Sequence, residues 1–215
     1  MKNFFASEAR YSSIVILANG SFPKHVLPLQ LLRDAKKIIC CDGAARSLLR
    51  FGRQPDAIVG DGDSLSKNFK SKYNHLLHID KNQDDNDLAK AFRFCMFNNW
   101  RNLTILGATG LRDDHALGNI GWLADFVAEA NVSMFTDQGC FTPLAKSGVL
   151  ATLPGQPVSI FSFDNATEIS SKGLQYPLKN LKLTRWWQAT LNIATGKRLS
   201  ISFSGGPVLV FRAYF

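Results

Sequence analysis

This sequence lacks the features of a membrane protein or of a secreted, disulfide-bonded protein. No apolar run in its 215 residues approaches the length needed to cross a bilayer. The first ten residues have too short a hydrophobic stretch for a secretory signal. The four cysteines, Cys40, Cys41, Cys95 and Cys140, form no CxxC pair and no His/Cys metal spacing. We therefore expect a cytoplasmic protein whose thiols are reduced and mostly buried.

The chain also lacks a nucleic-acid-binding pattern, although its formal net charge is +8. Its lysines and arginines are scattered, with no continuous basic helix and no aromatic-basic RNA-binding signature. We interpret the charge as a solvated surface that also attracts anionic small molecules, and we expect no nucleic-acid partner.

The first two thirds of the chain alternates buried-strand patterns with helical patterns, which predicts an α/β domain over residues 1–140. Its mostly parallel, Rossmann-like sheet would carry helices on both faces, with a ligand site beyond the carboxyl ends of the strands. Strands are expected at residues 13–18, 37–41, 57–59, 75–78, 103–106 and 132–135, and helices at 27–35, 44–51, 87–97 and 115–130.

The pattern changes after about Gly139, where no helical period survives and turn residues separate short strand candidates. This predicts a small all-β sandwich domain over residues 145–215. The strand candidates are residues 148–153, 158–163, 166–170, 184–187, 190–194, 199–203 and 207–211.

Acidic residues follow two neighbouring predicted strands. Asp42 ends one strand, and Asp61 and Asp63 follow the next, separated by Gly62. Residues two apart in extended backbone point the same way, and two carboxylates that close repel each other unless a cation lies between them. Mg²⁺ commonly bridges one or two carboxylates to substrate phosphates. Helix capping by Asp42 and a solvated Asp-Gly turn are the alternatives, and we favour metal binding at the Asp61 and Asp63 pair.

A second acidic group, residues 83–87 (QDDND), opens a predicted helix. Aspartates at a helix start are ordinary capping residues, so a metal role becomes attractive only in combination with Asp61 and Asp63. The glycine turn at 107–110 (GATG) follows a strand and precedes a helix, which favours an anion site with Arg112 as a phosphate partner. The turn alone is a weak signal, because it matches neither a P-loop nor GxGxxG.

In combination and order, these segments resemble the thiamin pyrophosphokinase family. The family shows a strand followed by Asp-Gly-Gly/Ala, then Gly-Asp-x-Asp-Ser, Asp-x-Thr-Asp and Gly-x-x-Gly-x-Arg-x-Asp-His. The corresponding segments here are residues 41–45 (CDGAA), 60–64 (GDGDS), 84–87 (DDND) and 107–115 (GATGLRDDH). The resemblance spans the whole chain, because the β-rich tail fits the family's thiamin-binding domain.

The resemblance implies an enzyme that transfers the pyrophosphoryl group of ATP to the hydroxyl of thiamin, giving thiamin diphosphate and AMP. It implies Mg²⁺ as cofactor, with Asp61, Asp63 and Asp87 as its ligands. Asp42 and Asp84 would be nearby ligands or base candidates. The nucleotide and its phosphates would be lined by Asn19, Gly20, Gly43, Gln83, Thr109, Arg112, Asp114 and His115. The family also implies a homodimer with the acceptor site between subunits.

The tail departs from the family's Gly-Thr-Ser-Asn run, which helps to hold thiamin. Here residues 189–192 read ATLN, so Asn192 is kept and Leu191 replaces the serine hydroxyl. We expect Asn192 and Tyr176 to bind the acceptor. Tyr176, Trp186 and Trp187 are candidates for stacking on a cationic or aromatic ring, although core packing is the more ordinary role for each one.

Leu191 keeps a second acceptor open, such as a hydroxymethyl pterin. A non-catalytic nucleotide or thiamin sensor is a further alternative, and the five acidic residues argue against it because a binder has little use for so much buried charge. A metal-dependent phosphatase is suggested by Asp61 and Asp63 alone, but it would not explain the glycine turn with Arg112.

Overall fold

The computed structural model describes residues 13–214, so the first ten residues lie outside the described part. The described residues group into two compact units by their contacts. One contains residues 13–122 and 129–137, and the other contains residues 123–128 and 138–214. The domain boundaries expected near residues 140 and 145 stay a prediction.

The first unit is built on a parallel sheet with strand order β6-β5-β1-β2-β3-β4. Val15 in β1 pairs with Ile38 in β2 on one side and with Thr104 in β5 on the other. The runs that form β1, β2 and β5 are almost entirely buried, as expected for a sheet covered on both faces. The strand bounds are β1 (Ile14–Leu17), β2 (Lys37–Cys41), β3 (Ala57–Gly60), β4 (Leu77–Ile79), β5 (Asn102–Leu106) and β6 (Asn131–Phe135).

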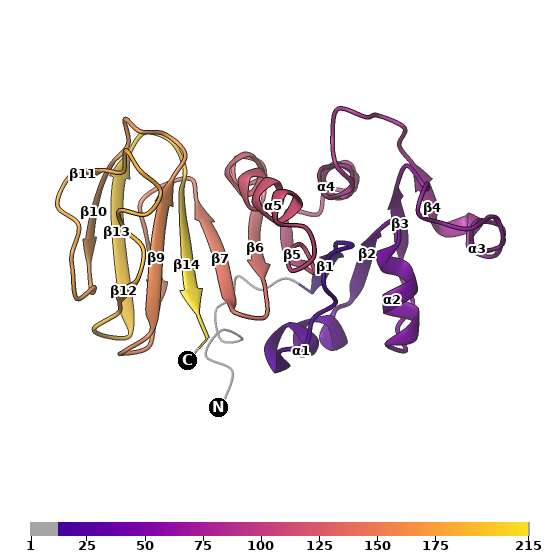
Figure 1. Cartoon of the computed structure of the whole chain (residues 1–215), viewed down its shortest axis with the longest axis horizontal. Helices are drawn as coiled ribbons and strands as arrows, with labels where there is room; N and C mark the ends of the chain where they lie inside the picture. The colour runs from indigo at the N-terminus through magenta and orange to yellow at the C-terminus, as the bar shows by residue number, and fades with distance from the viewer. Residues whose placement is uncertain (1–12, 215) are drawn as a thin grey trace. The chain divides into compact units, whose positions relative to one another are not determined.

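Helices cover both faces of this sheet, with α1 and α2 on one side and α4 on the other (Figure 1). Helix α4 packs against β1, β2 and β3 through an apolar face that includes Leu88, Phe92 and Cys95. Asn86 caps α4 by accepting a hydrogen bond from the Ala89 amide. The helices are α1 (Val26–Asp34), α2 (Ala44–Arg50), α3 (Lys67–Lys72), α4 (Asp87–Phe97) and α5 (Asp113–Phe126), with a 3₁₀ turn, η2 (Asn74–Leu76), before β4.

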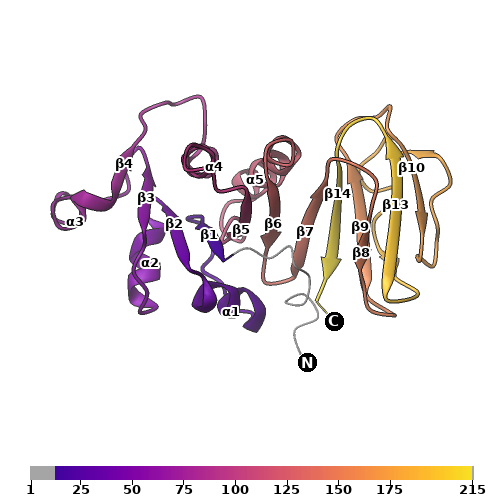
Figure 2. The ribbon, with the colours of Figure 1, turned by 180° about the vertical axis from the view of Figure 1, so that it is seen from behind.

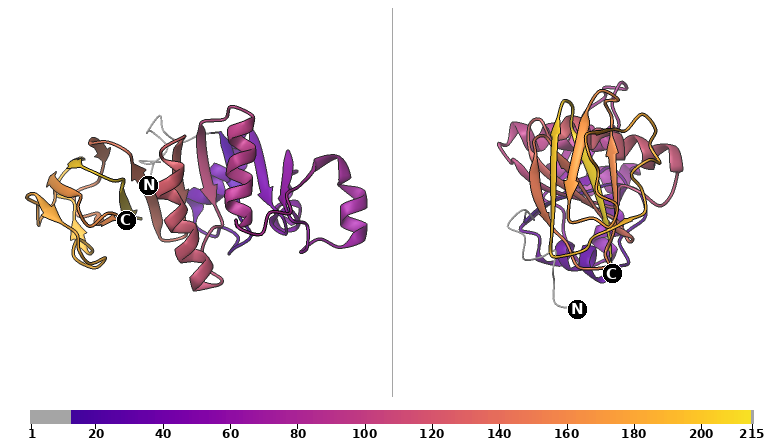
Figure 3. Two further views of the ribbon diagram at one scale, coloured as in Figure 1. Left: turned by 90° about the horizontal axis from the view of Figure 1, so that it is seen from above. Right: turned by 90° about the vertical axis from the view of Figure 1, so that its left-hand side faces the viewer.

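The second unit contains two antiparallel sheets, with orders β12-β9-β14-β7 and β11-β10-β13-β8 (Figure 2). Their alternating inward residues form one apolar core that includes Leu150, Ile160, Ile169 and Val210. The right-hand view of Figure 3 looks onto these strands. The strands are β7 (Gly139–Leu144), β8 (Gly148–Ala151), β9 (Pro157–Ser162), β10 (Glu168–Lys172), β11 (Leu181–Lys182), β12 (Asn192–Ile193), β13 (Arg198–Ser204) and β14 (Val208–Ala213).

The expected fold class is confirmed: a mostly parallel sheet with helices is followed by an antiparallel β sandwich. The four cysteines are free and buried, also as expected. Within residues 13–214, no helix is both long enough and apolar enough to span a membrane.

Two local expectations were wrong, and three elements were not expected. Residues 184–187 form a turn and not a strand, because the Gln188 side-chain oxygen accepts a hydrogen bond from the Arg185 amide. Residues 74–76 form η2 in place of the start of the strand expected at 75–78. The strands β7 and β11 and the helix α3 were not expected at all. Helix α3 has no buried residue, so its sequence lacks the spacing of apolar residues from which a helix is predicted.

Candidate active site

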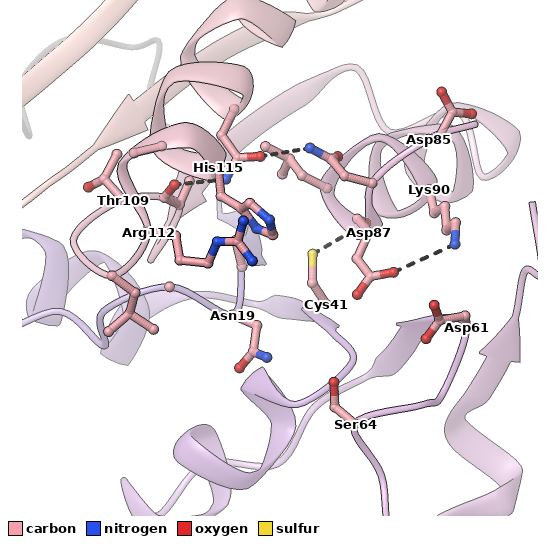
Figure 4. A pocket seen from close by; sticks show the side chains of 18 of the residues that line it. Asn19, Cys41, Asp61, Ser64, Asp85, Asp87, Lys90, Thr109, Arg112 and His115 are labelled. Atoms are coloured by element: carbon pink, nitrogen blue, oxygen red, sulfur yellow. Dashed lines mark hydrogen bonds and ion pairs between the residues drawn. The ribbon is translucent and has the colours of Figure 1, made fainter. Parts of the chain in front are cut away.

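A polar cavity opens at the carboxyl ends of β1, β2, β3 and β5, where the expected ligand site of a parallel sheet lies. The start of α4 and the glycine turn before α5 form its other walls. Asp61, Asp87 and Lys90 face the cavity from one side, and Arg112 and His115 from the other (Figure 4). Eight expected site residues line it: Asn19, Gly20, Asp61, Gln83, Asp87, Thr109, Arg112 and His115.

Asp42 lies beneath the acidic side of this cavity and is almost fully buried. One carboxylate oxygen, Oδ2, accepts a hydrogen bond of 2.9 Å from the Ser64 amide. The other, Oδ1, is buried without a hydrogen-bond partner among residues 13–214. Gly43, and not Asp42, occupies the N-cap position of α2, so the capping alternative for Asp42 was wrong. A buried, unsatisfied carboxylate oxygen is costly, which indicates a missing cationic or donor partner.

Gly60, the last residue of β3, lets Asp42 and Asp87 come together. A Cβ at this position would lie 3.0 Å from the Asp42 Cβ and 3.1 Å from the Asp87 Oδ1. The sequence therefore places its smallest residue where two carboxylates from different elements meet.

Asp61 and Asp63 do not share an extended backbone, contrary to expectation. The chain turns after β3, with Gly62 at φ 79°, and the Asp63 amide donates to Asp61 Oδ1 at 2.9 Å. As a result Asp61 lines the cavity, whereas Asp63 is exposed and does not line it. Asp84 is also exposed and outside the lining. The metal role of Asp63 and the catalytic role of Asp84 stay predictions.

The carboxylates influence one another electrostatically. The pKa of Asp87 is raised, first by its partial burial and then by the negative charges of Asp42 and Asp61. The ammonium group of Lys90 acts in the opposite direction, 3.7 Å from Asp87 Oδ1. The acidic side of the cavity therefore carries concentrated negative charge in the absence of a cation.

This donor set fits Mg²⁺ as an ion shared between protein and substrate. Within the described residues, no group of three or more His, Cys, Asp or Glu side chains forms a site that could hold a metal ion by itself. Mg²⁺ usually needs only one or two carboxylates, because water and substrate phosphates supply its remaining oxygens. Asp61 and Asp87 at the cavity, with Asp42 behind them, match that requirement.

The opposite side of the cavity is formed by two segments in close backbone contact. The Gly20 amide donates to the Gly107 carbonyl at 2.7 Å, and a Cβ on Gly20 would lie 2.5 Å from the same oxygen. Asn19 lies against Gly43, with its Nδ2 atom 2.7 Å from where a Cβ would stand. Gly20 thus brings β1 against the turn that carries Thr109, and Gly43 makes room for Asn19 without lining the cavity itself.

Arg112 and Asp114 form an exposed ion pair of 2.5 Å at the start of α5. The Asp114 carboxylate also accepts a hydrogen bond from the His115 amide, and these contacts lower its pKa to about 2. Asp114 therefore orients Arg112 and does not itself line the cavity. The guanidinium group remains available to an anion entering beside the glycine turn.

Sequence reasoning missed several cavity residues, among them Lys90, Asp85 and Asn119. Lys90 is 3% exposed and follows Asp87 by three positions, so an i,i+3 pair in the sequence was its only signal. Asn119 donates to the Ala108 carbonyl and accepts from Asn86, which ties α5 to the glycine turn and to the start of α4. Asp85 is held by Arg93, which also pairs with Asp80 at 3.0 Å.

The two residues expected to bind the acceptor lie in the second unit. Asn192 is 5% exposed, and its side chain binds the backbone of Tyr176. The Nδ2 atom donates to the Tyr176 carbonyl at 2.7 Å, and Oδ1 accepts from the Tyr176 backbone amide at 3.1 Å. Tyr176 is 64% exposed, Trp186 49% and Trp187 69%, so core packing was the wrong expectation for all three. Leu191 is exposed, with a left-handed backbone at φ 57°.

Comparisons with known proteins identify the family. The family model described as "Thiamin pyrophosphokinase, catalytic domain" matches residues 29–136, and the model described as "Thiamin pyrophosphokinase, substrate-binding domain" matches residues 139–211. The chain is 27% identical to Thiamin pyrophosphokinase 1 of Caenorhabditis elegans over 207 residues, covering 85% of this chain and 82% of that one. It is 31% identical over 147 residues to Thiamine pyrophosphokinase 1 of Oryza sativa subsp. japonica, covering 56% of this chain and 54% of that one.

Solved structures agree on the fold. Thiamine pyrophosphokinase from Bacillus subtilis matches with a TM-score of 0.78 and 23% identity, over 93% of this chain and 98% of that one. The enzyme from Candida albicans matches with a TM-score of 0.77 and 18% identity, over 95% of this chain and 91% of that one. With both of its family models matched in order along the sequence, the chain belongs to the thiamin pyrophosphokinase family.

Proposed function

We propose that this chain transfers the pyrophosphoryl group of ATP to the hydroxyl group of thiamin, giving thiamin diphosphate and AMP. The observation that carries the proposal is the meeting of Asp61 and Asp87 with Arg112 in one cavity at the strand ends. The acidic side suits a divalent cation, and the glycine-turn side suits phosphates.

The reaction needs one bond to form and one to break. The thiamin hydroxyl oxygen bonds to the β-phosphorus of ATP, and the bond from that phosphorus to the oxygen bridging it to the α-phosphorus breaks. AMP leaves with the bridging oxygen, and the hydroxyl proton passes to a carboxylate. Asp42, Asp61, Asp84 and Asp87 are the candidate bases.

Positioning and charge neutralisation dominate such transfers. Arg112 would bind phosphate oxygens, and the backbone of the glycine turn, with Thr109, would cradle them. Asn19 and His115 would border the nucleotide. Gly43 would act indirectly by making room for Asn19, and Asp114 would act indirectly by orienting Arg112.

Mg²⁺ bound by Asp61 and Asp87, with Asp63 as the third expected ligand, would neutralise phosphate charge and orient the triphosphate. The exposed aromatic side chains Tyr176 and Trp187, with Asn192 behind Tyr176, support acceptor binding in the second unit. We also propose a homodimer with the acceptor site between subunits, located in the cytoplasm.

The test is to incubate the protein with ATP, Mg²⁺ and thiamin and to separate the products. We expect AMP and thiamin diphosphate in equal amounts. Formation of ADP and thiamin monophosphate, or no product, would contradict the proposal. A parallel panel of thiamin, hydroxymethyl pterins and hydroxymethyl pyrimidines tests the acceptor, and thiamin should be the best substrate in spite of Leu191.

A further inference from the structure

Lys90 is a buried lysine at the centre of the acidic side of the cavity. It lies on α4 one turn after Asp87, and its side chain is only 2% exposed. Lysine is among the residues least often buried, because the ammonium group loses its hydration. Helix α4 packs against three strands, so the position of this ammonium group is fixed by the core of the first unit.

The ammonium group has more donors than the protein uses. Its nearest acidic oxygen is Asp87 Oδ1 at 3.7 Å, which is beyond hydrogen-bond distance. Within residues 13–214 its three N–H donors make no hydrogen bond, although the group lines the cavity. Figure 4 shows it directed to the space between Asp87 and Asp61. Unused donors on a buried cation indicate an anionic oxygen ligand.

A polyphosphate entering this cavity would meet Asp61, Asp85 and Asp87 on the α4 side. Arg112 lies across the cavity, on the side of the glycine turn, so it binds phosphate oxygens away from these carboxylates. Lys90 is the cationic side chain on the acidic side of the lining. A phosphate bound there would exchange a long ion pair for short, charge-assisted hydrogen bonds.

We propose that Lys90 is a catalytic residue that binds the phosphate oxygens of the pyrophosphoryl group being transferred. The inference rests on the proposed function and assigns one of its phosphate contacts to the Lys90 ammonium group. As the acceptor oxygen bonds to the β-phosphorus and AMP departs with the bridging oxygen, the ammonium group stabilises the oxygens of the moving group. Asp87, with Oδ1 3.7 Å from the Lys90 Nζ atom, holds the ammonium group at this position.

The decisive variant is Lys90→Met, which keeps the length of the side chain and removes its charge. Methionine has room here because Lys90 also borders a second cavity beside Val59 and Phe94. We expect kcat to fall by about 100-fold and the KM for ATP to rise by about tenfold, whereas the KM for thiamin stays within twofold. Lys90→Arg, which keeps the charge, should recover part of the affinity for ATP. The exposed Lys36 gives the control, Lys36→Met, which should behave as wild type.

A binding measurement separates this inference from the proposed function. Inorganic tripolyphosphate in the presence of Mg²⁺ should bind wild type and Lys36→Met equally, and Lys90→Met about tenfold more weakly, in calorimetry. Equal binding and equal kinetics in Lys90→Met would overturn the role of Lys90 while leaving the function intact. If wild type binds tripolyphosphate through Lys90 but makes no AMP, the proposed function fails instead.

Should Lys90→Met not fold, the wild-type protein decides the question. In protein labelled with ¹⁵N-lysine, tripolyphosphate should shift one slowly exchanging ammonium resonance, the one that disappears in Lys90→Arg. A spectrum without such a shift would refute the proposal.

Discussion

The side chain of Asn86 donates a hydrogen bond of 2.9 Å to that of Asn119, and so joins the start of α4 to α5. Asn119 also contacts the glycine turn, because its Nδ2 atom donates a hydrogen bond of 2.8 Å to the Ala108 carbonyl. The side-chain oxygen of Asn86, Oδ1, meanwhile caps α4 by accepting a hydrogen bond from the Ala89 amide. This chain of amides fixes the distance between the acidic and the phosphate-binding sides of the cavity.

Replacing Asn119 by alanine should loosen that connection. Two side-chain hydrogen bonds are lost, so we expect the free energy of unfolding to fall by about 1–3 kcal/mol. We expect kcat/KM for ATP to fall by about 10- to 100-fold, because the acidic side and the phosphate-binding side of the cavity lose their fixed spacing. Asn131→Ala removes an exposed amide pair with Asn102 and should leave turnover unchanged. Similar turnover in both variants would show that the connection has no catalytic consequence.

Gly60→Ala tests the close approach of Asp42 and Asp87. The added methyl group would lie 3.0–3.1 Å from both residues and must push them apart. We expect turnover to fall by about 100-fold and the protein to lose about 1–3 kcal/mol of stability. The matched control is Gly118→Ala in α5, where nothing lies within 4 Å of the new Cβ. This control should gain up to about 1 kcal/mol from helix propensity and keep its activity.

Neutralising Asp87 should lower the activity without lowering the thermal stability. Its pKa is raised by burial and by Asp42 and Asp61, so Asp87→Asn removes repulsion as well as the attraction of Lys90. We expect AMP formation to fall by at least about 100-fold while the midpoint of thermal unfolding without Mg²⁺ stays the same or rises. A large loss of thermal stability would instead assign Asp87 a structural role.

The assay of AMP formation also tests Asp63. Asp63→Ala should abolish AMP formation and leave the fold intact, as expected for a metal ligand on an exposed turn. Asp125→Asn, at an exposed position of α5, should match wild type. Full activity in Asp63→Ala would remove Asp63 from the proposed Mg²⁺ site and leave Asp61 and Asp87.

The sequence predicted which strand ends carry the cavity, because apolar runs followed by Gly and Asp mark both the strand and its end. Helix α4 was predicted with its bounds, 87–97, from the spacing of Leu88, Phe92 and Cys95. The backbone after β3 was not predicted. The alternation of Gly and Asp suggested an extended segment, but the hydrogen bond from the Asp63 amide to the Asp61 carboxylate holds it in a turn.

Lys90 escaped sequence reasoning for a different reason. A lysine three positions after an aspartate looks like a solvated helical pair. Only the packing of α4 against β1, β2 and β3 buries it. The pairing of Asn192 with the Tyr176 backbone likewise joins positions 16 apart, which no local pattern reveals.

Asn192→Ala should act on the acceptor more than on ATP. The amide holds both backbone groups of Tyr176, so its loss releases the segment that presents the exposed tyrosine ring. We expect the KM for thiamin to rise by about tenfold, the KM for ATP to stay within twofold, and stability to fall by about 1–3 kcal/mol. Tyr176→Ala should reproduce the KM change with a smaller loss of stability. Equal changes in both KM values would contradict a division of labour between the two units.

Asp164 should make the second unit sensitive to acid. Its carboxylate accepts hydrogen bonds from the Ala166 amide, the Thr167 hydroxyl and the Gly206 amide, and the first of these contributes most to lowering its pKa from the ordinary 3.8. A carboxyl whose folded pKa is lowered stabilises the fold above its unfolded pKa, and loses that contribution as the pH falls through the folded value. Asp164→Asn should therefore be less stable than wild type in urea titrations at pH 7. The difference should shrink as the pH is lowered from the ordinary pKa of 3.8 through the lower pKa of the folded state, because wild type then loses the same charge. A difference that is constant over this range would mean that Asp164 acts through its shape and not through its charge.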